Sequence, residues 1–102
     1  MAYLIYAIDH DGMDSVRESL RGKHREHLKS IGEKLLESGA LLDESGENVI
    51  GGISIIDTDN QKEAEAFAVE DPYSVAGIRK EMKVIRWRRR WINGEFQGEI
   101  NL

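Results

Sequence analysis

Residues 40–57, ALLDESGENVIGGISIID, decide the fold, because they place two apolar runs on either side of a short Glu/Ser/Gly/Asn segment. Such a segment between apolar runs is typical of a turn that joins two antiparallel strands. Gly51 and Gly52 lie within the second run and indicate a bulge or a close approach of two backbones. The stretch therefore predicts a β-hairpin in the middle of the chain.

One strand and one helix precede this hairpin. Residues 2–9, AYLIYAID, are rich in aromatic and β-branched types and predict a strand. A helix follows, with Asp14 or Ser15 as its cap. At about 100° per residue its apolar face runs as far as Leu35, and Gly39 suits its end.

A second helix and a last strand follow the hairpin. Residues 60–70 have helix-forming composition with Asn60 as a cap, Pro72 imposes an extended conformation on Asp71, and residues 81–87, EMKVIRW, predict a strand. The order is strand, helix, strand, strand, helix, strand. This is the α+β, ferredoxin-like βαββαβ plan, an antiparallel sheet with two helices on one face.

The other face of that sheet has no cover within the predicted domain. Apolar side chains on such a face usually need a partner, so we expect a homodimer whose sheets pack face to face. Residues 91–102, WINGEFQGEINL, contain Asn93-Gly94, a strong hairpin signal. We expect a single domain over residues 1–102 in which residues 88–102 are an extension, or an arm that reaches over the other subunit.

Composition limits the chemistry. The chain has 102 residues and no cysteine, which excludes disulfides, thiolate catalysis and Cys-ligated zinc. No apolar run is long enough for a membrane span, and no secretory signal is evident, so we expect a cytoplasmic protein. A formal net charge of −5 argues against nucleic-acid binding. RWRRRW at residues 86–91 is the local exception, because its tryptophans could stack on bases while its arginines neutralise phosphates. The alternative is a strand with one solvent-exposed face, whose arginines discourage aggregation at the sheet edge.

Two histidines on the inward face of the first helix are the main candidates for chemistry. His27 could act as a general base or acid if Asp71, after the second helix, held its ring. The alternative is a core histidine beside an aspartate that caps the next turn. His24 and His27, with His10 or Asp71, could instead form a two-histidine, one-carboxylate metal site. Packing or substrate contact is the other reading of His24.

Three further side chains could line a cleft or stabilise local structure. Asp9 ends the first strand, and Arg17 and Arg21 border the buried face of the first helix, where they could bind an anionic substrate. A turn residue and solvated arginines are the alternatives. The sequence has no glycine-rich phosphate loop, nucleophile elbow or Rossmann fingerprint.

These residues resemble the YCII (YciI-like) family of small dimeric α/β-barrel proteins. The matching pieces span roughly residues 3–87 and are YAID (6–9), DSVRESL (14–20), His27-Leu28, GALL (39–42) and KEAEAFAVEDPYSVAGI (62–78). The last is the most specific. Family members commonly carry an arginine three residues before the helix histidine, where this chain has His24. We therefore expect a pocket that either is less selective for anions or relies on Arg21 or Arg25. The loop at residues 9–15 is longer than usual, and the WINGEF tail exceeds the shared core.

The resemblance implies that His27 and Asp71 form a catalytic pair and that Asp9 and Tyr73 are pocket residues. Together with Arg21 and His24 on the first helix, we expect Asp9 and Tyr73 to bind the substrate. It implies an enzyme without cofactor or metal, a lyase or isomerase that acts on a small organic acid or anion. A non-catalytic ligand-binding or accessory protein is the alternative. As partners we expect a second subunit and the small molecule, and neither nucleic acid nor membrane.

Overall fold

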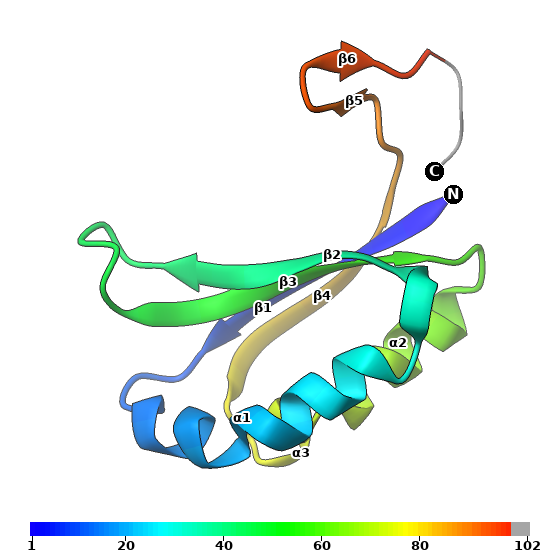
Figure 1. The fold of residues 1–102 in the computed structure, drawn as a ribbon. Coiled ribbons are helices and arrows are strands. Elements are labelled where there is room, and N and C mark those ends of the chain that lie inside the picture. The colour runs from blue at the N-terminus through cyan, green and yellow to red at the C-terminus, as the bar shows by residue number, and fades with distance from the viewer. Residues whose placement is uncertain (99–102) are drawn as a thin grey trace.

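Four antiparallel strands form one sheet in the computed structural model, which describes residues 1–98 (Figure 1). They are β1 (Ala2–Asp9), β2 (Leu35–Leu42), β3 (Val49–Asp57) and β4 (Arg79–Trp87), in the order β2-β3-β1-β4. Helix α1 (Asp14–Lys29) connects β1 to β2, and α2 (Gln61–Glu70) connects β3 to β4. The predicted ferredoxin-like plan is confirmed.

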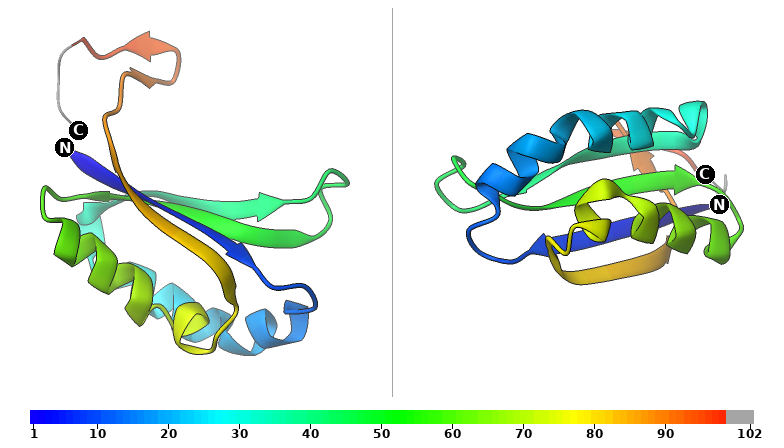
Figure 2. Two further views of the ribbon diagram at one scale, coloured as in Figure 1. Left: turned by 180° about the vertical axis from the view of Figure 1, so that it is seen from behind. Right: turned by 90° about the horizontal axis from the view of Figure 1, so that it is seen from below.

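Both long helices cover the same face of the sheet, and Figure 2 shows α1 and α2 side by side beneath it. Because side chains alternate along a strand, every second residue of β1 faces the helices. The core between the layers is a cluster of Ile5, Ile56, Phe67 and Ala68, against which Leu28, Ile31, Met82 and Val84 pack. The apolar faces of α1 and of the strands therefore face the core, as the sequence predicts.

The first helix ends earlier than predicted. It stops at Lys29, a single 3₁₀ turn η1 (Gly32–Lys34) follows, and Leu35 already lies in β2, opposite Ile56 of β3. Gly32 has φ 56°, a left-handed conformation that ends a helix, whereas Gly39 lies inside the strand. The start also differs, since Met13 occupies the cap position and makes no side-chain cap bond. Asp14 instead lies in the first turn, where its charge suits the helix dipole.

The second helix and the central hairpin follow the prediction. The Asn60 side chain accepts hydrogen bonds from the backbone N–H groups of Lys62 (2.9 Å) and Glu63 (3.2 Å). Gly51 lies where the backbones approach closely, since an added Cβ would stand 2.0 Å from the carbonyl oxygen of Ala7. After α2 the chain forms a further short helix, α3 (Pro72–Val75), where the sequence predicts a compact turn.

The sheet face opposite the helices carries Leu4, Tyr6, Ile53 and Ile85, which we call the uncovered face. A small hairpin of β5 (Trp91–Ile92) and β6 (Glu95–Phe96) stands on this side. Asn93 and Gly94 form its turn with φ values of 51° and 80°, as the Asn-Gly signal predicts. Residues 99–102 of the expected extension lie outside the described residues. Face-to-face dimerisation stays a prediction.

Candidate active site between the helices and the sheet

A cavity of about 630 Å³ lies between α1 and the sheet. Its floor is made of small residues, because Ser38 pairs with Ser54 and Ala40 pairs with Gly52 across β2 and β3, and all four line the cavity. Side chains this short leave the space under α1 unfilled. The volume falls in the range of roughly 300–1,000 Å³ that is typical of small-molecule sites.

Asp71 is fixed where α2 ends and α3 begins. Its backbone is extended (φ −55°, ψ 129°) before Pro72, and its Oδ1 atom accepts a hydrogen bond from the Tyr73 N–H at 3.0 Å. The carboxylate thus caps α3 and is held at the cavity wall with only 10% of its side chain exposed.

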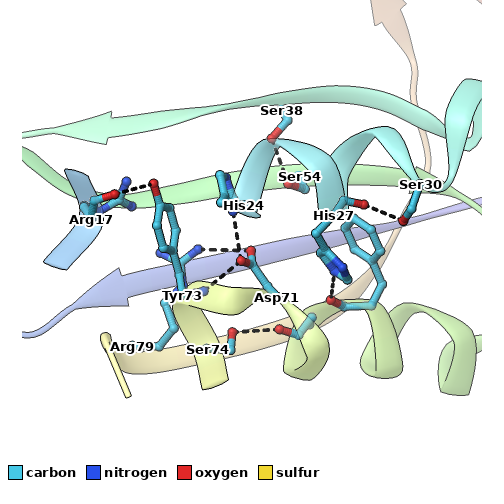
Figure 3. A network of polar contacts seen from close by, with 12 residues as sticks. Arg17, His24, His27, Ser30, Ser38, Ser54, Asp71, Tyr73, Ser74 and Arg79 are labelled. Atoms are coloured by element: carbon cyan, nitrogen blue, oxygen red, sulfur yellow. Dashed lines mark hydrogen bonds and ion pairs between the residues drawn. The ribbon is translucent and has the colours of Figure 1, made fainter. Parts of the chain in front are cut away.

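The imidazole that reaches this carboxylate belongs to His24 (Figure 3). Its Nδ1 atom lies 2.8 Å from Asp71 Oδ1, and its ring stacks on that of Tyr73 with centroids 4.1 Å apart. His24 lines the cavity, and its side chain is 19% exposed. The structure therefore joins a histidine and an aspartate 47 positions apart in sequence at the edge of an open space.

His27 does not reach Asp71, so the predicted pairing of these two residues is wrong. Its Nε2 atom lies 2.8 Å from the carbonyl oxygen of Phe67, and its ring stacks on the Phe67 ring. Three residues advance a helix by roughly 4.5 Å. Moving one turn toward the C-terminus of α1 therefore corresponds to moving one turn toward the N-terminus of α2. For this reason His27 contacts Phe67, whereas His24 contacts Asp71.

Asp71 is held in its charged form. Burial raises the pKa of its carboxyl group, but the hydrogen bonds from His24 and from the Tyr73 N–H, with the charges of His24 and Arg79, lower it overall below the ordinary value of 3.8. An ionised carboxylate only accepts hydrogen bonds, so Nδ1 of His24 is the donor. Nε2, which has no bond to the described residues, is left to exchange a proton with a ligand.

Asp9 does not line the cavity. One of its carboxylate oxygens accepts a hydrogen bond from Arg17 Nε at 2.6 Å and the other from Arg79 Nη1 at 2.7 Å, and only 3% of the side chain is exposed. Arg79 continues toward Asp71, with Nη2 3.7 Å from its Oδ2 atom. Asp9 therefore orients two arginines that do line the cavity, and the predicted contact of Asp9 with substrate has no direct geometric support.

Tyr73, a pocket residue implied by the resemblance, and Arg21, expected from its place on the first helix, both line the cavity. The Tyr73 ring lies between His24 and the Arg17 guanidinium, and its hydroxyl donates to the backbone carbonyl oxygen of Arg17 at 3.2 Å. Arg21 is exposed at the cavity rim, and within residues 1–98 it has no hydrogen-bond or ion-pair partner. Arg25 shares these properties, since it also lines the cavity and is exposed, so Arg21 and Arg25 are both placed to meet an anionic ligand.

The arginine expected three residues before the helix histidine is therefore present. With His24 as the residue that pairs with Asp71, the spacing identifies Arg21 as that arginine. The chain therefore carries the arginine that is missing only if His27 is the helix histidine. The spacing of three residues between Arg21 and His24 is the sequence signal that identifies His24. No sequence signal indicates that Arg79 belongs to the site, because it lies just after the matched segment 62–78 and is part of no recognisable motif.

The described residues contain no group of three or more His, Asp or Glu side chains that could hold a metal ion. No helix in the described part is long and apolar enough to cross a membrane. The basic segment at residues 86–91 lies outside the cavity lining.

Comparison with known proteins gives one family and several solved structures. The family model of the YCII-related domain matches residues 1–88. No curated protein matches the sequence. Among solved structures, the chain is 26% identical to 5-chloro-2-hydroxyhydroquinone dehydrochlorinase (TftG) from Burkholderia phenoliruptrix AC1100, solved in complex with 2,5-dihydroxybenzoquinone. The match covers 86% of this chain and 94% of that one, with a TM-score of 0.77. A crystal structure of At3g17210 from Arabidopsis thaliana is 13% identical, covers 90% and 97% of the two chains, and has a TM-score of 0.47.

Proposed function

This chain belongs to the YCII-related family, and from that premise we propose that it is a small-molecule enzyme that works by acid-base chemistry. The reaction is an elimination or an isomerisation, and the substrate is a small organic acid or another small molecule that is anionic near neutral pH. One observation carries the proposal: His24 is hydrogen-bonded to Asp71 at 2.8 Å beside a cavity of about 630 Å³.

The chemistry starts at Nε2 of His24, which takes a proton from the substrate. Asp71 stabilises the imidazolium that forms and keeps the ring in one orientation. In an elimination, the electrons of the broken bond form a double bond and the leaving group departs with its own bonding pair. In an isomerisation, the same proton returns to another atom. Neither step requires a cofactor.

Positive charge at the cavity suits an anion. Arg17 and Arg79 each have their charge partly balanced by Asp9, whereas Arg21 stands at the rim without a partner among the described residues. An arginine at this position can hold a carboxylate or an ionised hydroxyl while His24 reacts with a neighbouring atom. Arg21 is thus the proposed anion-binding residue.

The similarity to TftG supports this reaction class. That protein is a dehydrochlorinase and binds a dihydroxybenzoquinone. Loss of HCl requires a base for the proton and a route for the chloride, and His24 with Asp71 supplies the base. We propose a hydroxylated ring as the first substrate class to test, because such a compound is planar, small and acidic.

The test compares two histidines on the same helix face. His24→Asn should lower turnover of 5-chloro-2-hydroxyhydroquinone, followed as chloride release, by about 10² to 10⁴-fold, the usual contribution of a general base. Asp71→Asn should lower kcat by roughly 10- to 100-fold, because one charge-assisted hydrogen bond to the imidazolium is lost. His27→Gln, which can still donate to the Phe67 carbonyl, should keep most of the activity.

Full turnover in the His24→Asn variant would end the proposal. If no compound of this class is converted but 2,5-dihydroxybenzoquinone binds, as measured by calorimetry, the protein is a ligand-binding one and the elimination is excluded for this class. Melting temperatures of all three variants separate lost chemistry from lost folding.

A further inference from the structure

The hairpin β5–β6 exposes a pair of aromatic side chains. Trp91 and Phe96 face each other across the hairpin with ring centroids 5.2 Å apart, yet 65% of Trp91 and 57% of Phe96 are accessible to solvent. Large aromatic side chains bury up to roughly 250 Å² each when they find a partner, and they are enriched at protein interfaces. The pair is therefore a candidate contact surface.

The hairpin holds its shape through its own bonds. The N–H of Gln97 donates to the carbonyl oxygen of Arg90 at 2.7 Å, and Nη1 of Arg90 donates to the carbonyl oxygen of Gly98 at 3.1 Å. The Asn93-Gly94 turn has the positive φ values that a tight hairpin needs. A two-stranded hairpin alone is marginally stable in water, so a surface that covers its aromatic pair would stabilise it.

The hairpin also stands on the side of the uncovered face. In Figure 1 it lies on the opposite side of the sheet from α1 and α2, beyond the end of β4. Leu4, Tyr6 and Ile53 of the uncovered face are half-buried, and Ile85 is 49% exposed. Any molecule that covers this face therefore approaches the exposed aromatic pair as well.

Charge indicates which molecule that is. Residues 88–98 carry three arginines and one glutamate, a formal charge of +2, while residues 1–87 carry 11 Lys and Arg against 17 Asp and Glu, a formal charge of −6. The basic segment 88–98 is therefore complementary in charge to the acidic residues 1–87 of a second copy. In a dimer with two-fold symmetry, segment 88–98 of each chain can contact residues 1–87 of the other.

We propose that the β5–β6 hairpin is a dimerisation arm, which packs Trp91 and Phe96 against a second copy of this chain bound over the uncovered face. The arm lies outside the part of the chain matched by the family model, residues 1–88, so this contact is specific to chains that carry such an extension. The inference is independent of the reaction proposed above.

Analytical ultracentrifugation of the full chain over a range of concentrations tests the arm. The wild type should dimerise, and Trp91→Ser with Phe96→Ser should raise the dimer Kd by at least about tenfold, as expected for buried aromatic contacts. Arg88→Glu should raise it in the same direction. Val75→Ser is the matched control: Val75 is 74% exposed but lies on α3, on the helical side, so the Kd should not change.

A photocrosslink gives the direct contact. With p-benzoylphenylalanine in place of Phe96, irradiation should link two chains, and mass spectrometry should place the link on β1–β4 of the other chain. A wild type that sediments as a monomer, an unchanged Kd in the double serine variant, or crosslinks only within one chain would each overturn the proposal. Unchanged thermal unfolding of the sheet domain in the variants excludes misfolding as the cause of a raised Kd.

Discussion

Replacing Asp9 by asparagine should destabilise the fold strongly. The side chain is 3% exposed and its two oxygens bind Arg17 at 2.6 Å and Arg79 at 2.7 Å, while those arginine side chains are only 14% and 11% exposed. Asparagine keeps the volume but removes the charge, so two largely buried guanidinium groups lose their shared counter-ion. Breaking a buried pair in this way costs about 3–5 kcal/mol. We expect about 3 kcal/mol, because Asp71 remains 3.7 Å from Arg79.

Urea denaturation monitored by circular dichroism measures this loss of unfolding free energy directly. A domain of this size has a free energy of unfolding of roughly 5–15 kcal/mol, so the shift in midpoint should be large. Glu81→Gln is the control, because the Glu81–Lys83 pair is 45% and 57% exposed and such pairs contribute about 0–1 kcal/mol. A loss below about 1 kcal/mol in the Asp9→Asn variant would refute the view that Asp9 is a buried counter-ion.

Three further predictions concern pH, backbone packing and ligand charge. The pKa of Asp71 is lowered in the folded protein, so the contribution of Asp71 to stability is complete above its ordinary pKa of 3.8 and is lost as pH falls through the pKa of the folded state. When the free energy of unfolding is measured against pH, Asp71→Asn should therefore lose less stability on acidification than the wild type. Gly51→Ala should lower stability by about 1–3 kcal/mol, because its Cβ would stand 2.0 Å from the Ala7 carbonyl oxygen, whereas Gly39→Ala, with open space around it, should not cause such a loss in the same melt. Arg21→Gln should weaken binding of 2,5-dihydroxybenzoquinone by about tenfold in calorimetry and leave the melting temperature unchanged, and equal affinity would remove Arg21 from the site.

The strands and the second helix could be predicted because their signals are local. The aromatic and β-branched residues of positions 2–9 identify β1, and Asn60 caps α2 in the structure as predicted from the sequence. The end of α1 was missed because the apolar spacing continues through Leu35, while Gly32, whose positive φ ends the helical segment, carries no apolar signal. Pairing of Leu35 with Ile56 is a long-range interaction that helical periodicity does not contain.

The site could be predicted only to within one helical turn. His24 and His27 share a face of α1, so periodicity alone cannot tell which one reaches Asp71. That choice depends on how far α1 and α2 are shifted along each other, which core packing sets. The cavity is equally invisible in the sequence, because it results from the absence of side chains where β2 and β3 pair.

The His24–Asp71 pair and the floor of the cavity come from different parts of the fold. His24 and Asp71 are fixed by the helical layer, whereas Ser38, Ala40, Gly52 and Ser54 of the floor belong to the sheet. A larger residue at position 38 or 54 would change the cavity volume without disturbing the hydrogen bond between His24 and Asp71. Under the proposed function, such an architecture lets the range of accepted molecules diverge while the proposed acid-base chemistry is retained.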